Sequence, residues 1–193
     1  MKNFIIISAV LTFSISCHSQ TRGLSEAAIS TNNAIANNVI QNTSYLKDVD
    51  NSLNKFEGIW KGEYNGKVYE FRLVKKIKYG ENPQKDIILG RFEVKDSSGT
   101  IIYSTLNNSD VEAGLKGINF QSGNKIYHLN YTESRNGCGK SGVAYIYFKD
   151  PNDLKTLSLG FMSDGDIMVK GKCDNYTPLL PYSDIAILRL KKQ

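Results

Sequence analysis

Residues Gly58–Leu73 read GIWKGEYNGKVYEFRL and carry the pattern that decides the fold. Apolar and polar side chains alternate on both sides of Asn65-Gly66, and an Asn-Gly pair between two such runs indicates a two-residue β-hairpin turn. The cross-strand pairs that this turn predicts are Trp60 with Phe71, Gly62 with Tyr69, and Lys61 with Glu70. Paired aromatic rings and opposite charges contribute about 0.2–1 kcal/mol each, so the register of this hairpin is well specified.

The two-residue period continues through the rest of the chain, and no convincing helix follows Phe56. Short turn sequences, such as the one at Asp150–Asp153, separate the apolar runs. Further strands are predicted at Ile87–Lys95, Thr100–Thr105, Gly117–Gln121, Lys125–Thr132, Val143–Phe148, Lys155–Met162, Asp166–Gly171 and Asp184–Lys191. Sequential hairpins of this kind favour an all-β fold, an antiparallel up-and-down barrel of about 8–10 strands. The last strand is apolar on both faces, so we expect Tyr45–Phe56 to cover it from outside the barrel.

The composition fits one globular domain with a sizeable core. The chain has 193 residues, 40% of them hydrophobic, and 24 Lys and Arg against 19 Asp and Glu, which gives a net charge of +5. This excess of positive charge is too small and too dispersed for a nucleic-acid-binding surface. The length and apolar content also exclude a disordered chain, collagen and a protein with several membrane spans.

The first residues predict export. Lys2 precedes an apolar run, Phe4–Ile15, which is too short to span a bilayer and matches the core of a signal peptide. The following Ser14-Ile15-Ser16-Cys17 resembles a bacterial lipobox, in which the cysteine becomes the first mature residue and carries the lipid. Two alternatives stay open, namely cleavage after Ser19, which leaves a soluble protein, and an uncleaved membrane helix.

These features divide the chain into three parts: a signal peptide at residues 1–16, a lipid-anchored, Asn-rich tether at 17–44, and a single β-barrel domain at 45–193. The anchor on Cys17 predicts a cell-envelope protein, an outer-membrane lipoprotein that faces the periplasm or the cell surface. A soluble periplasmic or secreted protein is the alternative. The membrane is therefore an expected partner through the lipid anchor, and nucleic acid is not.

Cys138 and Cys173 are the other two cysteines. In an oxidising compartment this pair predicts a disulfide, with two buried thiols as the alternative. No neighbouring ligand completes a tetrahedral metal site, and we expect no metal and no other cofactor. Alternating strands place the two cysteines at opposite ends of the sheet, so the loop Glu133–Gly142 or the segment Lys172–Ser183 must fold back to join them.

Motifs for catalysis are weak. Gly139-Lys140-Ser141 is not a phosphate loop, because Ser134 stands where that loop needs a glycine. His128 is the only histidine of the predicted domain and no Gly-x-Ser-x-Gly motif accompanies it, so we expect a surface or pocket residue. Since no pair of carboxylates stands out either, we expect a protein that is not an enzyme.

Parts of the sequence resemble two known families. Gly58-Ile59-Trp60 resembles the Gly-x-Trp signature of lipocalin-like barrels, in which the Trp closes one end and a late Arg covers it. Arg189 is the only candidate for that Arg in the final strand, where Leu188 and Leu190 compete with it for the interior.

The second resemblance is to uncharacterised flavobacterial-type predicted lipoproteins, a domain of unknown function. It rests on Leu53–Trp60, on the hairpin through Leu73 and on Leu180-Pro181 before the closing strand. This resemblance implies an envelope location and a single β domain, and it brings no catalytic residues.

The chain is rich in aromatic residues, with eleven Tyr and eight Phe, and this leads to two hypotheses of function. A hollow barrel would bind a small apolar or sugar ligand or act as an accessory module; a filled barrel would be a protein-binding module, an inhibitor or an assembly factor. The candidate cavity-lining residues are Tyr64, Tyr69, Tyr103, Tyr127 and Tyr131. The candidate structural residues are Gly58, Trp60, Asn65, Gly66 and Phe71.

Overall fold

The computed structural model describes residues 20–25, 43–121, 123–133, 138–164, 173, 176–181 and 186–193. The predicted signal peptide, Cys17 and the predicted strand Asp166–Gly171 lie outside these residues. The strands are β1 (Gln20–Gly23), β2 (Thr43–Lys47), β3 (Gly58–Tyr64), β4 (Lys67–Tyr79), β5 (Gln84–Lys95), β6 (Ile101–Ser104), β7 (Leu115–Gln121), β8 (Ile126–Thr132), β9 (Ser141–Tyr147), β10 (Thr156–Ser163) and β11 (Leu188–Lys192). A short 3-10 helix, η1 (Asn54–Phe56), precedes β3. Within the described ranges, no helix is both long and apolar enough to cross a membrane.

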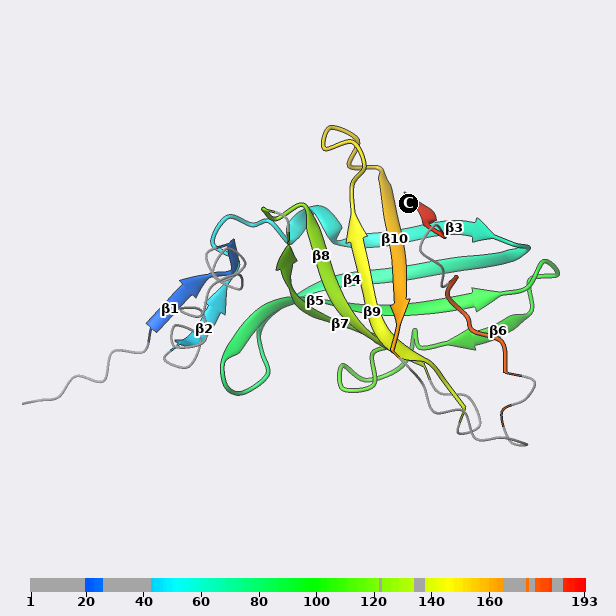
Figure 1. Ribbon diagram of the computed structural model, residues 1–193, viewed down its shortest axis with the longest axis horizontal. Coiled ribbons are helices and arrows are strands. Elements are labelled where there is room, and N and C mark those ends of the chain that lie inside the picture. The colour runs from blue at the N-terminus through cyan, green and yellow to red at the C-terminus, as the bar shows by residue number, and fades with distance from the viewer. Residues whose placement is uncertain are drawn as a thin grey trace, which may run out of the picture.

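A closed antiparallel barrel is the centre of the fold (Figure 1). Its strands follow one another in the order β3, β4, β5, β7, β8, β9, β10 and β11. Two short ladders complete the ring, one between β5 and β7 at Gly90 and Leu115 and the other between β11 and β3 at Lys192 and Trp60. The predicted all-β, up-and-down barrel is therefore confirmed.

The side strand β6 departs from simple sequential pairing. The twelve-residue β5 pairs with β6 through Glu93–Lys95 and with β7 through Leu89 and Gly90. The connection from β6 to β7 returns along the outer face of the barrel, where Asp110 forms ion pairs with Lys76 and Arg91. Because β5 is long enough to meet two partners, β6 extends the sheet without entering the ring.

The hairpin at Asn65-Gly66 has the predicted register, in which Trp60 pairs with Phe71, Gly62 with Tyr69, and Lys61 with Glu70. Both turn residues have positive φ, 48° for Asn65 and 73° for Gly66, as a two-residue turn of type I′ requires. Gly62 has a second role, since a Cβ there would lie 2.3 Å from the backbone oxygen of Arg189. Glycine therefore lets β11 approach β3 and close the barrel.

Large aromatic side chains fill the interior of the barrel. Those less than 2% exposed are Trp60, Tyr69, Tyr127, Tyr131, Phe56, Phe71, Phe92 and Phe120. Neighbouring rings touch across the interior, with centroid distances of 5.6 Å for Phe71 and Phe92 and 5.7 Å for Phe92 and Tyr131. Such pairs contribute about 0.5–1.5 kcal/mol each beyond the burial of their area, so the aromatic residues predicted on the strands form a packed core.

The strands β1 and β2 lie outside the ring and extend the sheet. β1 pairs with β2 in parallel, and β2 pairs with β5 in parallel at Tyr45 and Leu46. β1 and the first residues of β2 fall within 17–44, the range predicted as a tether. The described parts of that range therefore join the sheet.

The expectation that Tyr45–Phe56 covers the outside of the last strand is wrong. Phe56 enters the end of the barrel, where its ring lies 5.9 Å from that of Tyr127 and 5.4 Å from that of Phe148. The last strand is shorter than predicted, and within it Leu188 and Leu190 are buried while Arg189 is exposed. Its outer face is therefore polar and needs no cover.

Candidate functional site

One end of the barrel is closed by residues 48–57, which we call the plug. The Asp48 side chain is 2% exposed and accepts hydrogen bonds from the backbone N–H groups of Ser52 and Leu53, at 2.8 and 3.1 Å. Its carboxylate also forms an ion pair with Lys75 of β4 at 2.7 Å. Leu53 and Phe56 are fully buried beside these polar contacts. The plug is thus held by one buried charge pair and by apolar packing.

A second buried carboxylate, Asp86 of β5, ties the entering chain to the barrel. It accepts hydrogen bonds from the hydroxyl of Tyr45 at 2.6 Å, from the backbone N–H of Asp48 at 2.9 Å and from that of Lys78 at 3.0 Å. Burial and the hydrogen bond to Asp86 raise the pKa of Tyr45 to about 12. Asp48 and Asp86 are therefore both engaged in structural contacts that hold the plug on the barrel.

Trp60 lies beneath the plug, as the resemblance to lipocalin-like barrels implies. Its indole Nε1 donates a hydrogen bond to the backbone oxygen of Phe56 at 2.8 Å. The cation that covers the ring is Lys192, whose Nζ lies 5.2 Å from the ring centroid, and the expected Arg189 is instead exposed on the outer face. The expectation for Arg189 is wrong because Arg189 alternates with the inward-facing Leu188 and Leu190, whereas Lys192 pairs directly with Trp60.

The opposite end of the barrel is closed by residues 176–181, which we call the mouth segment. The disulfide predicted between Cys138 and Cys173 is confirmed, with their Cα atoms 5.8 Å apart. Lys140 lies beside Glu133, since the backbone N–H of Glu133 donates to the backbone oxygen of Lys140 at 3.0 Å. A disulfide typically adds about 2–4 kcal/mol of stability. The disulfide fixes Cys173, three residues before the mouth segment begins.

Glu133 holds the mouth segment from inside. Its carboxylate is buried and accepts hydrogen bonds from the hydroxyls of Tyr131 and Tyr176 and from the backbone N–H of Leu179. Burial raises the pKa of the Tyr131 hydroxyl, and the Glu133 carboxylate raises it further. The hydroxyl of Tyr69 donates to the backbone oxygen of Leu179 at 2.8 Å, and burial raises the pKa of this tyrosine to about 12. The sequence does not single out Glu133, since nothing distinguishes it from the other acidic residues.

A groove of about 340 Å³ opens between the hairpin turn and the mouth segment, and we call it the mouth groove. Its lining residues are Tyr64, Asn65, Lys67, Tyr69, Thr177, Pro178, Leu179, Leu180, Pro181 and Ala186. Lys67 crosses one wall to donate to the backbone oxygen of Pro178 at 3.3 Å. The groove is apolar in most of its lining and is bounded by the hairpin turn and the mouth segment.

The structure brings together two of the five tyrosines predicted to line a cavity. Tyr64 and Tyr69 meet in the mouth groove, whereas Tyr103 lines a separate depression beside Lys116. Tyr127 and Tyr131 are each 1% exposed and belong to the core. Among the described residues, the mouth groove is therefore where two of the predicted tyrosines meet open space.

A smaller pocket of about 240 Å³ lies beside the plug, and we call it the basic pocket. Its lining residues are Lys55, Lys125, Phe148, Lys149, Pro151 and Leu154. The sequence does not point to this site, because its residues come from three separate segments that only the closed barrel brings together.

His128 is half-buried on the outer face of β8, opposite Tyr145 of β9. Burial lowers the pKa of its imidazole. In the part of the chain that the structure describes, His128 has no hydrogen bond or ion pair, and no group of three or more His, Cys, Asp or Glu is placed to hold a metal ion. A nucleophile, histidine and acid are therefore not assembled among these residues.

A family model described as a family of unknown function (DUF6705) matches residues 1–164, and the chain belongs to this family. Nothing among the curated proteins or the solved structures matches the chain. Membership agrees with the predicted domain of unknown function. The flavobacterial lipoprotein type stays a prediction.

Proposed function

We propose that this member of the family is an exported, lipid-anchored cell-envelope protein that is not an enzyme and that binds a protein partner through its mouth groove. The observation that carries this proposal is the filled interior of the barrel. Both ends are closed, by the plug and by the mouth segment, and aromatic rings occupy the space between them. Recognition must then take place on the outside.

Two glycines on the barrel strands, Gly90 and Gly117, have no room for a larger side chain. A Cβ on Gly90 would lie 2.8 Å from a methyl group of Leu73, and a Cβ on Gly117 would lie 2.1 Å from the hydroxyl of Tyr127. Pockets that enclose small molecules usually measure about 300–1,000 Å³. The close contacts at these two positions support a packed interior there over a pocket of that size.

The mouth groove has the properties of a protein-binding surface. Tyr64 is partly exposed and packs against the core, so its ring can meet a partner, whereas Tyr69 is 1% exposed and supports the wall through its hydrogen bond to Leu179. Tyrosine is enriched in interfaces because it offers a large contact area and a polar group at a low entropic cost. The disulfide and Glu133 keep the opposite wall in place, which lowers the cost of ordering the site on binding.

A second candidate function is the binding of a small apolar or sugar ligand in the same groove. Its volume of about 340 Å³ lies within the range of small-molecule pockets, and aromatic rings at its wall suit both kinds of ligand. This function is the one predicted for a lipocalin-like binding protein, except that the ligand would lie in the mouth groove and not inside the barrel.

The anchor would place this barrel at the membrane surface. Cys17 precedes the first residue of β1, Gln20, by three positions, and three residues span at most about 11 Å. An acyl chain on Cys17 would therefore keep β1 close to the bilayer. A soluble periplasmic or secreted form is the alternative if cleavage follows Ser19.

Native mass spectrometry of the protein purified from its own envelope tests these statements together. We expect an acylated Cys17 and an intact disulfide, with no small molecule retained. A small molecule retained in a one-to-one ratio would overturn the protein-binding function in favour of the second candidate. Persistence of a Cys17→Ala variant in the membrane fraction would count against the lipid anchor.

Photo-crosslinking in the native envelope tests the mouth groove itself. A benzophenone side chain in place of Tyr64 should give a discrete cross-linked product. The same side chain in place of Tyr103, a partly buried tyrosine outside the groove, is the matched control and should give none. Equal products from the two positions would contradict a partner site at the mouth.

A further inference from the structure

We infer that the plug end of the barrel is a docking site for anionic phospholipid, which seats the barrel on the membrane that carries its anchor. This inference rests on the proposed function, because the lipid anchor brings the barrel to that surface. It adds an orientation: the basic pocket faces the bilayer, and the mouth groove faces away from it.

The basic pocket gathers positive charge without any acid in its lining. Among the described residues, Lys125 and Lys149 have no ion pair and no hydrogen bond through their ammonium groups. Lys55 donates to the backbone oxygen of Asn124 at 3.1 Å and lies 5.1 Å from the centre of the Phe56 ring. Burial lowers the pKa of Lys55, so an anion in the pocket would stabilise its charged form.

The surroundings of the pocket add to this positive charge. Lys155, Lys191 and Lys192 lie at the same end, where Lys192 donates its backbone N–H to the oxygen of Lys155 and Lys191 donates its ammonium to Thr156. The acids nearby are engaged in local contacts. The carboxylates of Asp150 and Asp153 accept the N–H groups of their own turn, and that of Glu57 accepts the N–H of Lys75. These three carboxylates keep their charge, but the six lysines at this end outnumber them, so the end complements a negatively charged surface.

An apolar residue projects between these lysines. Leu154, on the loop between β9 and β10, is 45% exposed and lines the pocket with Pro151 and Phe148. The ring of Phe148 is fixed by Trp60 behind it, at 6.0 Å between centroids. Basic residues around an apolar tip are typical of proteins that rest in the interface of an anionic membrane.

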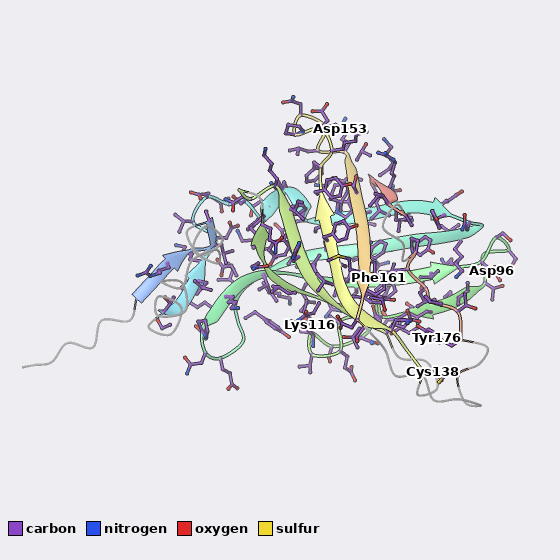
Figure 2. The ribbon with its side chains drawn as sticks, in the orientation of Figure 1. Asp96, Lys116, Cys138, Asp153, Phe161 and Tyr176 are labelled. Carbon is purple, nitrogen blue, oxygen red and sulfur yellow. A yellow bond between two sulfur atoms is a disulfide. The ribbon has the colours of Figure 1, made fainter. Side chains whose placement is uncertain are left out.

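The size of the pocket favours a contact with headgroups over capture of a whole lipid. At about 240 Å³ it is smaller than the 300–1,000 Å³ of pockets that enclose small molecules. Its place in the fold suits docking as well. Figure 2 shows Asp153, at the tip of the loop that carries Leu154, on the opposite side of the barrel from Tyr176 and Cys138 near the mouth segment.

A fluorescent reporter on this loop tests the docking. The only tryptophan of the native chain, Trp60, is fully buried, so a Leu154→Trp variant adds one exposed indole. The acylated protein is reconstituted into vesicles with brominated lipid tails that contain either phosphatidylglycerol or only phosphatidylcholine. We expect bromine quenching of the new indole in the anionic vesicles, and its loss in the zwitterionic vesicles and at 1 M salt, since salt screens these charges.

Ile101→Trp is the matched control for position. Ile101 is 56% exposed and lies on β6, which pairs with the part of β5 nearest the mouth. Its indole should stay unquenched. Equal quenching at the two positions would overturn the inference, because it would show an anchored barrel with no preferred face.

Removal of the lysines tests the charge. A Lys125→Gln, Lys149→Gln double variant on the Leu154→Trp background should shift the ratio of docked to undocked protein about 25-fold, at about 5-fold for each lysine. Lys61→Gln with Lys95→Gln removes two charges from ion pairs on the outer wall and should change little. Quenching that survives the loss of Lys125 and Lys149 would overturn the inference.

The intact mass of each sample separates the two proposals. An acylated protein whose L154W indole is not quenched in anionic vesicles would overturn the docking and leave the anchor standing. A protein without an acyl chain would overturn the anchor, and its sedimentation with anionic but not zwitterionic vesicles would then support the docking on its own.

Discussion

The two ends of the barrel are closed by contacts of different range. At the plug, Asp48 accepts hydrogen bonds from residues four and five positions further along the chain. At the mouth, Cys138 bonds to Cys173 across 35 residues, and Tyr69 reaches Leu179 across 110. The plug is therefore organised by local hydrogen bonds and is joined to the barrel by the Asp48–Lys75 ion pair and by hydrogen bonds such as that from Asp48 to Asp86. The mouth, in contrast, exists only once distant parts of the chain have met.

The two ends should therefore respond to different chemical changes. The plug depends on a buried charge, so a change in charge should open it. The mouth depends on a covalent bond and on one carboxylate shared by several donors, so reduction or the loss of that carboxylate should loosen it. Changes at one end should leave the other intact, because the packed aromatic core separates them.

The largest effect is expected from Asp48→Asn. This change leaves the Lys75 ammonium, whose side chain is 13% exposed, with Asn54 as its remaining partner, and breaking a buried pair costs about 3–5 kcal/mol. The free energy of unfolding, measured by urea denaturation, should fall by this amount. Asp50→Asn is the matched control, since Asp50 is exposed and accepts a hydrogen bond only from Ser25 among the described residues. Similar losses for both variants would contradict a plug held by Asp48.

Loss of the disulfide should have the next effect. A Cys138→Ser, Cys173→Ser double variant removes a cross-link between residues 35 positions apart, worth about 2–4 kcal/mol. The rates of backbone amide hydrogen exchange should rise in the mouth segment and stay unchanged in the plug. A general rise in exchange at both ends would show that the ends are not independent.

Glu133→Gln sharpens the same contrast without breaking a covalent bond. The amide keeps the shape of the side chain but loses the charge that strengthens the hydrogen bonds from Tyr131 and Tyr176. We expect a loss of about 1–3 kcal/mol in the free energy of unfolding. The affinity of the mouth groove for its partner should fall as well. An unchanged free energy of unfolding would mean that this carboxylate does not hold the mouth segment.

At the plug end, Lys192→Met should cost about 0.5–1 kcal/mol, since it removes the cation over the Trp60 ring. Arg189→Met is the control and should cost less, because Arg189 faces away from the core. The two variants are compared by their midpoint temperatures of thermal unfolding, followed by tryptophan fluorescence. The reverse order would restore Arg189 as the residue that covers Trp60.

The smallest effect is expected at His128, on the barrel wall between the two ends. Burial holds its pKa in the folded protein below the ordinary value of 6.5, so the unfolded chain binds a proton more readily. The stability is therefore fully present above about pH 6.5 and falls as the pH decreases below it. His128→Gln should remove this part of the pH dependence, and an identical pH profile in the variant would contradict the shift.

Much of the β3–β4 hairpin could be predicted because its determinants are neighbours in the chain. Asn65-Gly66 specifies the turn, and the alternation around it specifies which side chains face inward. The disulfide could be predicted from the number of cysteines and the inferred compartment. The cover of Trp60 could not, because the run Ile185–Leu190 offers apolar residues at both parities, and only the pairing of β11 with β3 and β10 decides that Leu188 and Leu190 face inward.

The sites were harder to predict than the strands. Glu133 becomes a central residue of the mouth only through contacts with Tyr176 and Leu179, which follow it by more than 40 positions. The basic pocket needs Lys55, Lys125 and Lys149 to meet at one end of a closed ring. Neither arrangement leaves a pattern in the sequence, since no short-range spacing relates these residues.

The sequence by itself determined that this chain folds into antiparallel ribbons with aromatic side chains on their inner face, because alternation and turn chemistry act between residues a few positions apart. Only the tertiary structure decided that the barrel is filled, that β5 closes it onto β7, and which residues seal each end. Those outcomes depend on how side chains from distant strands share one interior volume, and a list of residues does not contain that information.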